Sequence, residues 1–311
     1  AVGTGTGAML AAVAIVGPAC VTTGMSPVIA GLSICLGATA GTFPTDAVFW
    51  FPEKYNGIAS KDLPHLFERC YKGNGGNFGI GLAIANSLAE AGATVYIISR
   101  TGKVKEGYPE SVPGTVHIKG DITNVESMKK ICAELADKHD GHLDFLVNNA
   151  GATYKCLAQD VPAEEFDRVI NVNVTCVFRM CQICYPYLKK SPHKGRIINI
   201  SSMSAHLGFT QVVPYCTSKA AVCGMTRGLA VEWAEDNICV NSIAPGWFHS
   251  KMLDDVMDDD RRKRILNRIA VHDFGKTEDL GAMALFLIGP HGSYITGQDY
   301  ALDGGTLAYG Y

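Results

Sequence analysis

Tyr215 and Lys219 stand four residues apart, a spacing that could support proton transfer. On a helix, residues at this spacing lie on one face with adjacent side chains. A tyrosine of pKa about 10 is a poor acid or base at neutral pH, but a neighbouring ammonium stabilises the phenolate and lowers that pKa. The spacing therefore predicts Tyr215 as a general acid/base tuned by Lys219. The competing interpretation is an ordinary exposed helical pair.

A glycine-rich run from Gly75 to Gly81 precedes an expected helix over residues 82–91. Its glycines permit a tight turn, and the free N–H groups at a helix N-terminus favour negative charge. A strand is expected directly afterwards at 94–99, as in a dinucleotide-binding unit. The run predicts a pyrophosphate site made by Gly75, Asn77, Phe78, Gly79, Ile80 and Gly81.

Ser99 and Arg100 stand at the end of the strand expected at 94–99, where an acidic residue would bind a ribose 2′-hydroxyl and repel a 2′-phosphate. Arg100 instead offers a planar cation that pairs with phosphate and stacks on a base. We therefore predict NADP(H) in preference to NAD(H), against the alternative of a solvated arginine. Asp121, followed by Ile122, is expected either to accept a hydrogen bond from the adenine amino group or to cap the next helix.

Short β-branched runs alternate with stretches of helical length from residue 75 onward. This alternation predicts an α/β fold, a doubly wound parallel sheet of Rossmann type with helices on both faces. In such sheets ligands bind at the carboxyl ends of strands, so the segments after strands carry the functional information. The expected strands are 94–99, 115–119, 143–147, 196–200 and 238–243.

Three further motifs each follow one of these strands: Asn148-Asn149-Ala150-Gly151, Ser201-Ser202 and Pro245-Gly246. Together with the glycine run and the Tyr215–Lys219 pair, they resemble the short-chain dehydrogenase/reductase family in order and spacing. The resemblance covers about Gly75 to Tyr311. A set of this kind is highly specific, although each motif alone would be weak.

The resemblance implies a nicotinamide-dependent oxidoreductase in which Tyr215 transfers the proton. It implies that Lys219 also binds the nicotinamide ribose and that Ser202 donates a hydrogen bond to the substrate carbonyl oxygen. It further implies that Asn173 holds a proton-relay water. Asn171 is the competing candidate for this last role, and Asn173 fits the family's register better.

The resemblance also implies further cofactor and substrate contacts. The cofactor set comprises Asn149, Ala150, Gly151, Tyr215, Lys219, Pro245, Gly246, Trp247, Phe248 and Ser250. His206, Phe209 and Trp247 are expected to line the substrate pocket. The two aromatic residues could equally be plain packing residues, and a lone histidine is more often structural. Residues 297–305 resemble the last strand and turn of the family, where members form a tetramer interface, so a homo-oligomer is expected.

The first 45 residues contain no Asp, Glu, Lys or Arg. Two apolar runs at 8–20 and 27–40 are shorter than the roughly 20 residues of a spanning helix, and we interpret them as broken membrane helices. The segment 1–57 resembles the C-terminal end of gluconate-type permeases. It lacks a repeat partner for a transport site, and the start at Ala rather than Met suggests a fragment. We interpret it as a permease remnant or fusion.

An irregular junction at 58–74 separates this segment from the oxidoreductase domain at 75–311. Residues 63–74 are neither apolar nor periodic enough for the first strand that the family requires, and without that strand cofactor affinity should fall. One hypothesis is that a permease tail is joined to a neighbouring reductase gene, with a shifted reading frame between Pro64 and Gly75. A gluconate operon would make a sugar acid or keto-sugar acid the leading substrate. The expected reaction interconverts a secondary alcohol and a ketone on a sugar acid or polyol.

The bulk composition gives no sign of a nucleic-acid partner, because the net charge is −3. The 11 cysteines are scattered, and Cys181 and Cys184 have the apolar flanks of a buried helix, so we expect reduced packed thiols and no metal. The catalytic domain is expected in the cytoplasm, acting on a small molecule, with membrane contact only through residues 1–57. The competing hypotheses are a membrane transport fragment with an incidental reductase domain and an inactive binding protein of the same fold.

Overall fold

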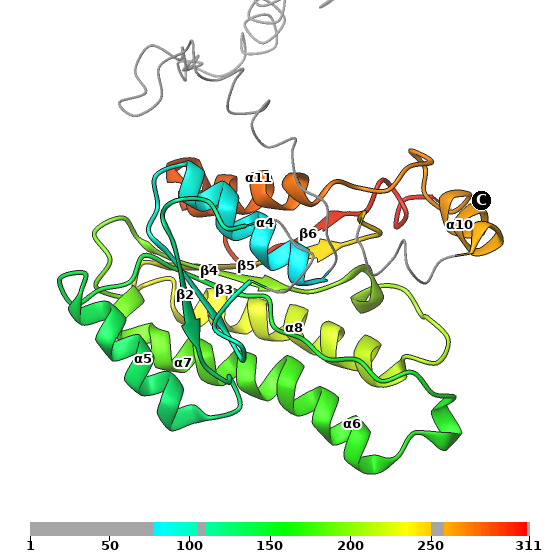
Figure 1. The fold of residues 1–311 in the computed structure, drawn as a ribbon, viewed down its shortest axis with the longest axis horizontal. Coiled ribbons are helices and arrows are strands. Elements are labelled where there is room, and N and C mark those ends of the chain that lie inside the picture. Colours follow the sequence, from blue (N-terminus) through cyan, green and yellow to red (C-terminus); the bar gives the residue numbers. More distant parts are fainter. Residues whose placement is uncertain (1–76, 105–109, 250–257, 310–311) are drawn as a thin grey trace, which may run out of the picture. The chain divides into compact units, whose positions relative to one another are not determined.

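The computed structural model describes residues 77–104, 110–249 and 258–309, all within one compact unit. Helices and strands are interspersed along it, although the first two strands follow one another without a described helix between them (Figure 1). The elements are α4 (Asn77–Glu90), β1 (Val95–Ser99), β2 (Thr115–Lys119), α5 (Val125–Asp137), β3 (Phe145–Asn148), η3 (Ala158–Asp160), α6 (Ala163–Ile170), η4 (Asn171–Thr175), α7 (Cys176–Leu188), β4 (Gly195–Ile200), η5 (Met203–Ala205), α8 (Val213–Glu232), β5 (Ile238–Pro245), α10 (Asp259–Leu266), α11 (Thr277–Ile288), η6 (Pro290–Tyr294) and β6 (Asp299–Leu302). All five expected strands are confirmed, each within about two residues at either end.

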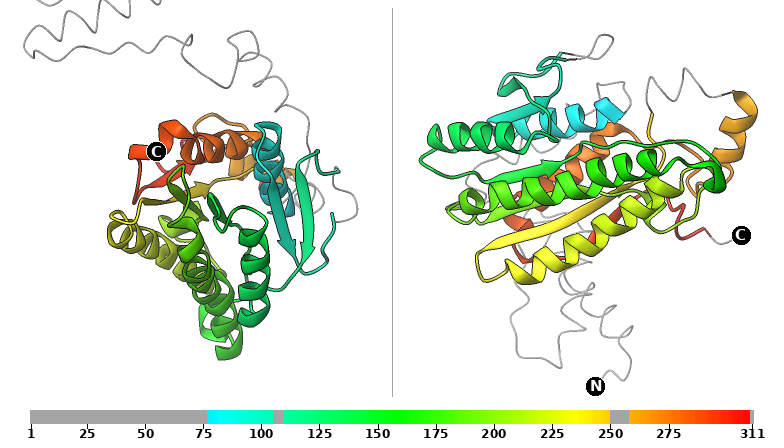
Figure 2. Two further views of the ribbon diagram at one scale, coloured as in Figure 1. Left: turned by 90° about the vertical axis from the view of Figure 1, so that its left-hand side faces the viewer. Right: turned by 90° about the horizontal axis from the view of Figure 1, so that it is seen from below.

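Among the described residues every strand pairing is parallel, as the alternation predicts, and the paired strands form two sheets. Across the described ranges, β1 pairs with β2, and β3, β4, β5 and β6 form a second sheet in that order. Figure 2 shows the two-stranded sheet beside α4. In a doubly wound sheet the strand before the glycine turn lies in the centre, between the two halves. That strand would precede Asn77 and so lies outside the described residues.

Helices cover both faces of the four-stranded sheet, with α4 and α11 on one face and α5, α7 and α8 on the other (Figure 1). Successive strand residues point to opposite faces, so Ile198 packs with the first pair of helices and Ile197 with the second group. Val95 of β1 joins the same apolar cluster as Ile198, so both sheets share one core. Cys181 and Cys184 are buried in α7, which confirms their predicted packing role.

Helix α4 begins at Asn77, five residues before the predicted start, so Gly79 and Gly81 lie inside the helix and not in a preceding turn. A glycine without Cβ allows close approach even within a helix. A Cβ built on Gly81 would lie 2.5 Å from Asn149 Nδ2. Glycine at position 81 therefore allows the N-terminal part of α4 to lie against the segment that follows β3.

Several predictions lie outside the described residues, namely segments 1–57 and 58–74, Gly75 and Ser250. Across the helices that the structure does describe, none combines the length and the apolar character needed to cross a membrane.

Candidate active site

Tyr215 and Lys219 both lie on α8, which confirms their expected place on one helix. Lys219 Nζ lies 5.6 Å from the centroid of the Tyr215 ring. The lysine side chain is buried, with 4% of its surface exposed, and its ammonium donates a 2.7 Å hydrogen bond to the Ile200 carbonyl at the end of β4. The pair therefore faces the sheet and is not an ordinary exposed helical pair.

The pKa values of this pair differ from the expectation that Lys219 lowers the pKa of Tyr215. Burial raises the pKa of Tyr215, and a hydrogen bond with Ser202 only partly opposes that rise. Burial also lowers the pKa of Lys219 to about 8. The expectation was wrong because the loss of water around a buried phenolate outweighs the attractions it receives.

Ser202 stands between β4 and η5, and its side-chain oxygen accepts a 3.2 Å hydrogen bond from the backbone N–H of Ser204. The two serine hydroxyl oxygens lie 2.6 Å apart. Because Ser202 also hydrogen-bonds Tyr215, the structure brings together three side chains from two segments: Ser202, Tyr215 and Lys219.

Asn173 is fully buried within η4, a π-helical turn between α6 and α7. Its Oδ1 accepts a 2.7 Å hydrogen bond from Ala152 N, while its Nδ2 donates to Ala152 O at 2.8 Å and to Ser218 Oγ at 2.9 Å. Ser218 in turn donates to the Tyr215 carbonyl. Asn173 thus ties the segment after β3 to the helix that carries Tyr215, whereas Asn171 is exposed.

A buried chain of hydrogen-bonded polar side chains, which was not predicted from the sequence, joins β3, β4 and α8 near these residues. Asn148 Nδ2 donates to Asn199 Oδ1 at 2.9 Å, and Asn199 Nδ2 donates to Thr226 Oγ1 at 3.0 Å. The chain fastens the carboxyl ends of β3 and β4 to α8. The available signal was Asn199, a polar residue in a strand buried on both faces, which needs a partner.

The first turn of α4, Arg100 and Asn149 offer groups that fit a dinucleotide. The turn contains no acidic side chain, so its N–H groups remain attractive to phosphate. Asn149 meets this turn at Gly81, and Arg100 is exposed just after β1. This donor set suits a negatively charged cofactor with phosphate groups.

Asp121 follows β2, and its Oδ1 accepts hydrogen bonds from the backbone N–H of Thr123 at 2.9 Å and from the Thr123 hydroxyl at 2.8 Å. These bonds lower the pKa of Asp121, with a smaller contribution from Arg100. The prediction that Asp121 caps the next helix is wrong, because Asn124 caps α5 through Ser127 N. Ile122, beside it, packs against the apolar core.

The segment after β5 contacts the segment after β6. A Cβ built on Gly246 would lie 2.6 Å from Asp303 Cα, so glycine allows this close approach. Trp247 is half-buried, while Phe248 is buried in the core and forms a β-bridge with Gly275. Because the Phe248 side chain packs inward, as that of Ile80 does, these two residues can meet a cofactor only through their backbones.

Among the described contacts, none joins any two of the three residues that were predicted to line the substrate pocket. His206 binds Asp299, with its Nε2 2.6 Å from Asp299 Oδ2. Phe209 and Trp247 are each half-buried on separate segments. Among the other predicted cofactor residues, Ala150 and Gly151 follow β3, while Ser99 and Pro245 end β1 and β5, as expected.

Two models of known protein families match different parts of the chain. Residues 73–306 match the family model described as enoyl-(acyl carrier protein) reductase, and residues 1–67 match the model of the GntP family permease. The second match confirms the predicted likeness of the N-terminal segment to gluconate-type permeases.

The match with individual relatives spans nearly the whole length of each relative. The chain is 36% identical over 234 residues to 2-dehydro-3-deoxy-D-gluconate 5-dehydrogenase of Bacillus subtilis, covering 74% of this chain and 91% of that protein. It is 37% identical over 236 residues to a 3-oxoacyl-(acyl-carrier-protein) reductase of Thermotoga maritima, covering 74% and 94%. Among solved structures, a gluconate 5-dehydrogenase of Burkholderia cenocepacia in complex with NADP and tartrate matches with a TM-score of 0.66 and 26% identity, covering 75% and 93%.

The family model covers well over half of the chain, and it matches the same residues that form the parallel α/β fold and contain the grouped Ser202, Tyr215 and Lys219. The chain therefore belongs to the short-chain dehydrogenase/reductase family of NAD(P)-dependent oxidoreductases.

Proposed function

We propose that this chain interconverts a secondary alcohol and a ketone on a sugar acid or polyol, using NADP(H). The observation that carries the proposal is the grouping of a serine hydroxyl, a tyrosine hydroxyl and a buried ammonium at the carboxyl end of β4. The tyrosine and serine hydroxyls can each donate a hydrogen bond to the same substrate oxygen. Two such bonds stabilise the negative charge that develops on a carbonyl oxygen during reduction.

The bound nicotinamide supplies or accepts the hydride. Tyr215 holds the accompanying proton on its hydroxyl oxygen, gives it to the substrate oxygen in reduction and takes it back in oxidation. Ser202 donates a hydrogen bond to that same oxygen. The raised pKa of Tyr215 keeps the phenol protonated at neutral pH, so reduction is expected to run near neutrality and oxidation to accelerate as the pH rises.

Lys219 provides positive charge close to the Tyr215 ring, and its hydrogen bond to Ile200 keeps the ammonium in place. With a pKa of about 8 it remains mostly protonated at neutral pH. We assign it the ribose-binding role as well, as the family resemblance implies, and a Cβ built on Gly151 would lie 3.8 Å from its Nζ, so the segment after β3 comes close to the ammonium. Asn173 acts as a positioning residue through Ala152 and Ser218.

The cofactor preference rests on Arg100, an exposed cation at the end of β1 where an acidic residue would exclude a 2′-phosphate. The Burkholderia cenocepacia relative contains NADP, which supports the same preference. NAD(H), which lacks the 2′-phosphate, would be the weaker cofactor.

The substrate class is supported by the sugar-acid dehydrogenases among the relatives and by the permease-like residues 1–67. The relative from Thermotoga maritima favours a second candidate, a 3-oxoacyl thioester. Parallel assays with keto-sugar acids and with a 3-oxoacyl thioester separate the two, because the preferred substrate has the larger kcat/KM.

We further propose that residues 1–57 are a permease remnant or fusion and that 58–74 are a junction before the catalytic domain at 75–311. The two family models leave only residues 68–72 between them, which supports a join in this region. Resequencing the coding DNA tests the proposed reading-frame shift, and an unambiguous frame together with tight NADPH binding by the purified chain would contradict a damaged junction.

The catalytic proposal is tested with Tyr215→Phe, which removes the hydroxyl and keeps the ring. We expect kcat for carbonyl reduction to fall about 100- to 10,000-fold, the range that general acid/base catalysis contributes. NADPH binding, followed by fluorescence, should change little. A variant that retained its activity would exclude Tyr215 as the proton donor. Loss of both activity and NADPH binding would indicate a folding defect, for which Ser202→Ala is the second test.

A further inference from the structure

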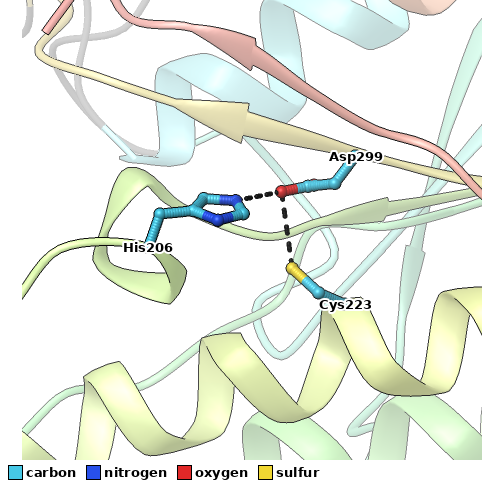
Figure 3. A group of neighbouring side chains, drawn as sticks. All are labelled: His206, Cys223 and Asp299. Carbon is cyan, nitrogen blue, oxygen red and sulfur yellow. Dashed lines mark hydrogen bonds and ion pairs between the residues drawn. The ribbon is translucent and has the colours of Figure 1, made fainter. Parts of the chain in front are cut away.

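His206, Cys223 and Asp299 meet at a point where three elements converge (Figure 3). His206 follows η5, Cys223 lies on α8 and Asp299 opens β6. His206 Nε2 lies 2.6 Å from Asp299 Oδ2, and Cys223 Sγ lies 3.4 Å from the same oxygen. One nitrogen, one sulfur and one carboxylate oxygen thus face each other within 4.8 Å.

This donor set is the one that zinc-type ions use in proteins. Zn²⁺ binds histidine nitrogen, thiolate sulfur and carboxylate oxygen at about 2.0 to 2.3 Å, usually in tetrahedral geometry. In that geometry neighbouring donor atoms stand ~3.5 Å apart, as the trigonometry of those bond lengths gives. The distance between Cys223 Sγ and Asp299 Oδ2 already has this value. The Nε2 atom of His206 would have to move about 1 Å away from Asp299 Oδ2 to reach it. Within the described ranges no other group of three such side chains converges.

The surroundings hold two of the three donors in place. Asp299 Oδ1 accepts a 2.6 Å hydrogen bond from Ser201 Oγ, which leaves Oδ2 directed at the other two residues. Outer hydrogen bonds of this kind orient carboxylate ligands in metal sites. Cys223 is buried on a long helix. The third donor, His206, has 41% of its side chain exposed, so it can adjust and the ion can enter from solvent.

We propose that His206 Nε2, Cys223 Sγ and Asp299 Oδ2 bind one divalent ion of the zinc class, with water as the fourth ligand. Thiolate is the ligand form of cysteine, so the Cys223 proton passes to solvent when the ion binds. One thiolate and one carboxylate then balance the two positive charges of the ion. The site lies beside the proton-transfer residues, since Ser201 precedes Ser202, but uses none of them.

Cobalt titration of the full chain tests the site, because Co²⁺ replaces Zn²⁺ and gives a charge-transfer absorbance only with a thiolate ligand. After treatment with chelator and reductant, one equivalent of Co²⁺ should produce that band, and Zn²⁺ should abolish it. Cys223→Ser should remove the band. Because loss of an outer hydrogen-bond partner costs roughly 10- to 100-fold in metal affinity, Ser201→Ala should weaken binding by that factor and His206→Gln by at least about 100-fold.

Matched controls separate this site from other thiols and imidazoles. His142→Gln removes a histidine that lies 3.6 Å from Asp144 and has no cysteine partner in the part of the chain that the structure describes, and Cys156→Ser removes a partly exposed thiol. Both should leave the cobalt band and the affinity unchanged. Zn²⁺ should also raise Tm in the unmodified chain and not in His206→Gln, whose exposed position makes a folding defect unimportant.

Two results would overturn the proposal. One is an unmodified chain without a thiolate-to-cobalt band at saturating metal. The other is a band that persists in Cys223→Ser or disappears in Cys156→Ser, since the thiolate would then come from elsewhere. In either case His206 and Asp299 are a hydrogen-bonded pair without a metal. Because the readout is metal binding, it is independent of whether the chain reduces any substrate.

Discussion

Replacing the buried Lys219 with methionine should stabilise the cofactor-free protein while abolishing its activity. Burial lowers the pKa of Lys219 from 10.5 to about 8, which means that the folded state disfavours the charged form. Each pKa unit corresponds to about 1.4 kcal/mol, so the difference costs about 3 kcal/mol of folding free energy at neutral pH. Methionine has a similar length and no charge to bury.

Part of this gain is lost, because the ammonium donates a hydrogen bond to the Ile200 carbonyl. Leaving a buried acceptor without that partner costs about 1 to 3 kcal/mol. The net gain for Lys219→Met at pH 7 is therefore about 0 to 2 kcal/mol. For a domain of this size, Tm should rise by about 2 to 4 °C per kcal/mol.

The pH dependence has a defined sign. Below pH 8 lysine is charged in both the folded and the unfolded states, so the full penalty applies and the variant has its largest advantage. Between pH 8 and 10.5 only the folded state loses the proton, so the unmodified protein gains stability as the pH rises. The advantage of Lys219→Met should therefore shrink across this window and reverse above it, where only the lost hydrogen bond remains.

Thermal unfolding of both proteins, followed by circular dichroism without cofactor at equal concentrations, measures the difference. We would compare the Tm difference between the two proteins at pH 7 with that at pH 10. All other titrating groups are present in both proteins, so their effects cancel in this difference. A variant that is less stable at pH 7, or a Tm difference that does not change with pH, would refute the reasoning that burial of this charge is costly.

Three further changes test other parts of the structure. Arg100→Glu should lower kcat/KM for NADPH by about 10- to 100-fold, as expected for loss of a charged hydrogen bond, and should leave kcat/KM for NADH unchanged or raise it. Equal losses of kcat/KM with the two cofactors would argue against a contact between Arg100 and the 2′-phosphate. Asn173→Ala removes three buried hydrogen bonds, so unfolding in urea should show a loss of about 3 kcal/mol, and a loss below 1 kcal/mol would show that water replaces them. Gly281→Ala should lower Tm, since a Cβ there would collide with Ser87 where α11 packs on α4, and an unchanged Tm would show that the helices separate readily.

Features that depend on neighbours in the chain were predictable. The five strands are short β-branched runs, and their periodicity is local, so their positions agree with the structure. Tyr215 and Lys219 share a face because helical geometry alone places residues four apart together. The early start of α4 was missed because glycines in a run indicate a turn, whereas here Gly79 and Gly81 lie within the helix and glycine at 81 leaves room for Asn149.

The pKa of Tyr215 was not predictable, because a pKa depends on how much water the fold removes from around the phenol and the sequence does not give that quantity. The buried chain through Asn148, Asn199 and Thr226 was missed for a related reason. Its members come from three elements that only the assembled sheet and α8 bring into hydrogen-bond distance.

By itself, the order of residue types determined the family, the parallel α/β class and the residues to consider for proton transfer, since each follows from local spacing along the chain. Only the tertiary structure decided that His206, Cys223 and Asp299 form one group, because 76 residues separate the last two and no short motif connects them. Side chains this far apart become neighbours only when a helix, a loop and the last strand pack together, and that packing is set by the whole core.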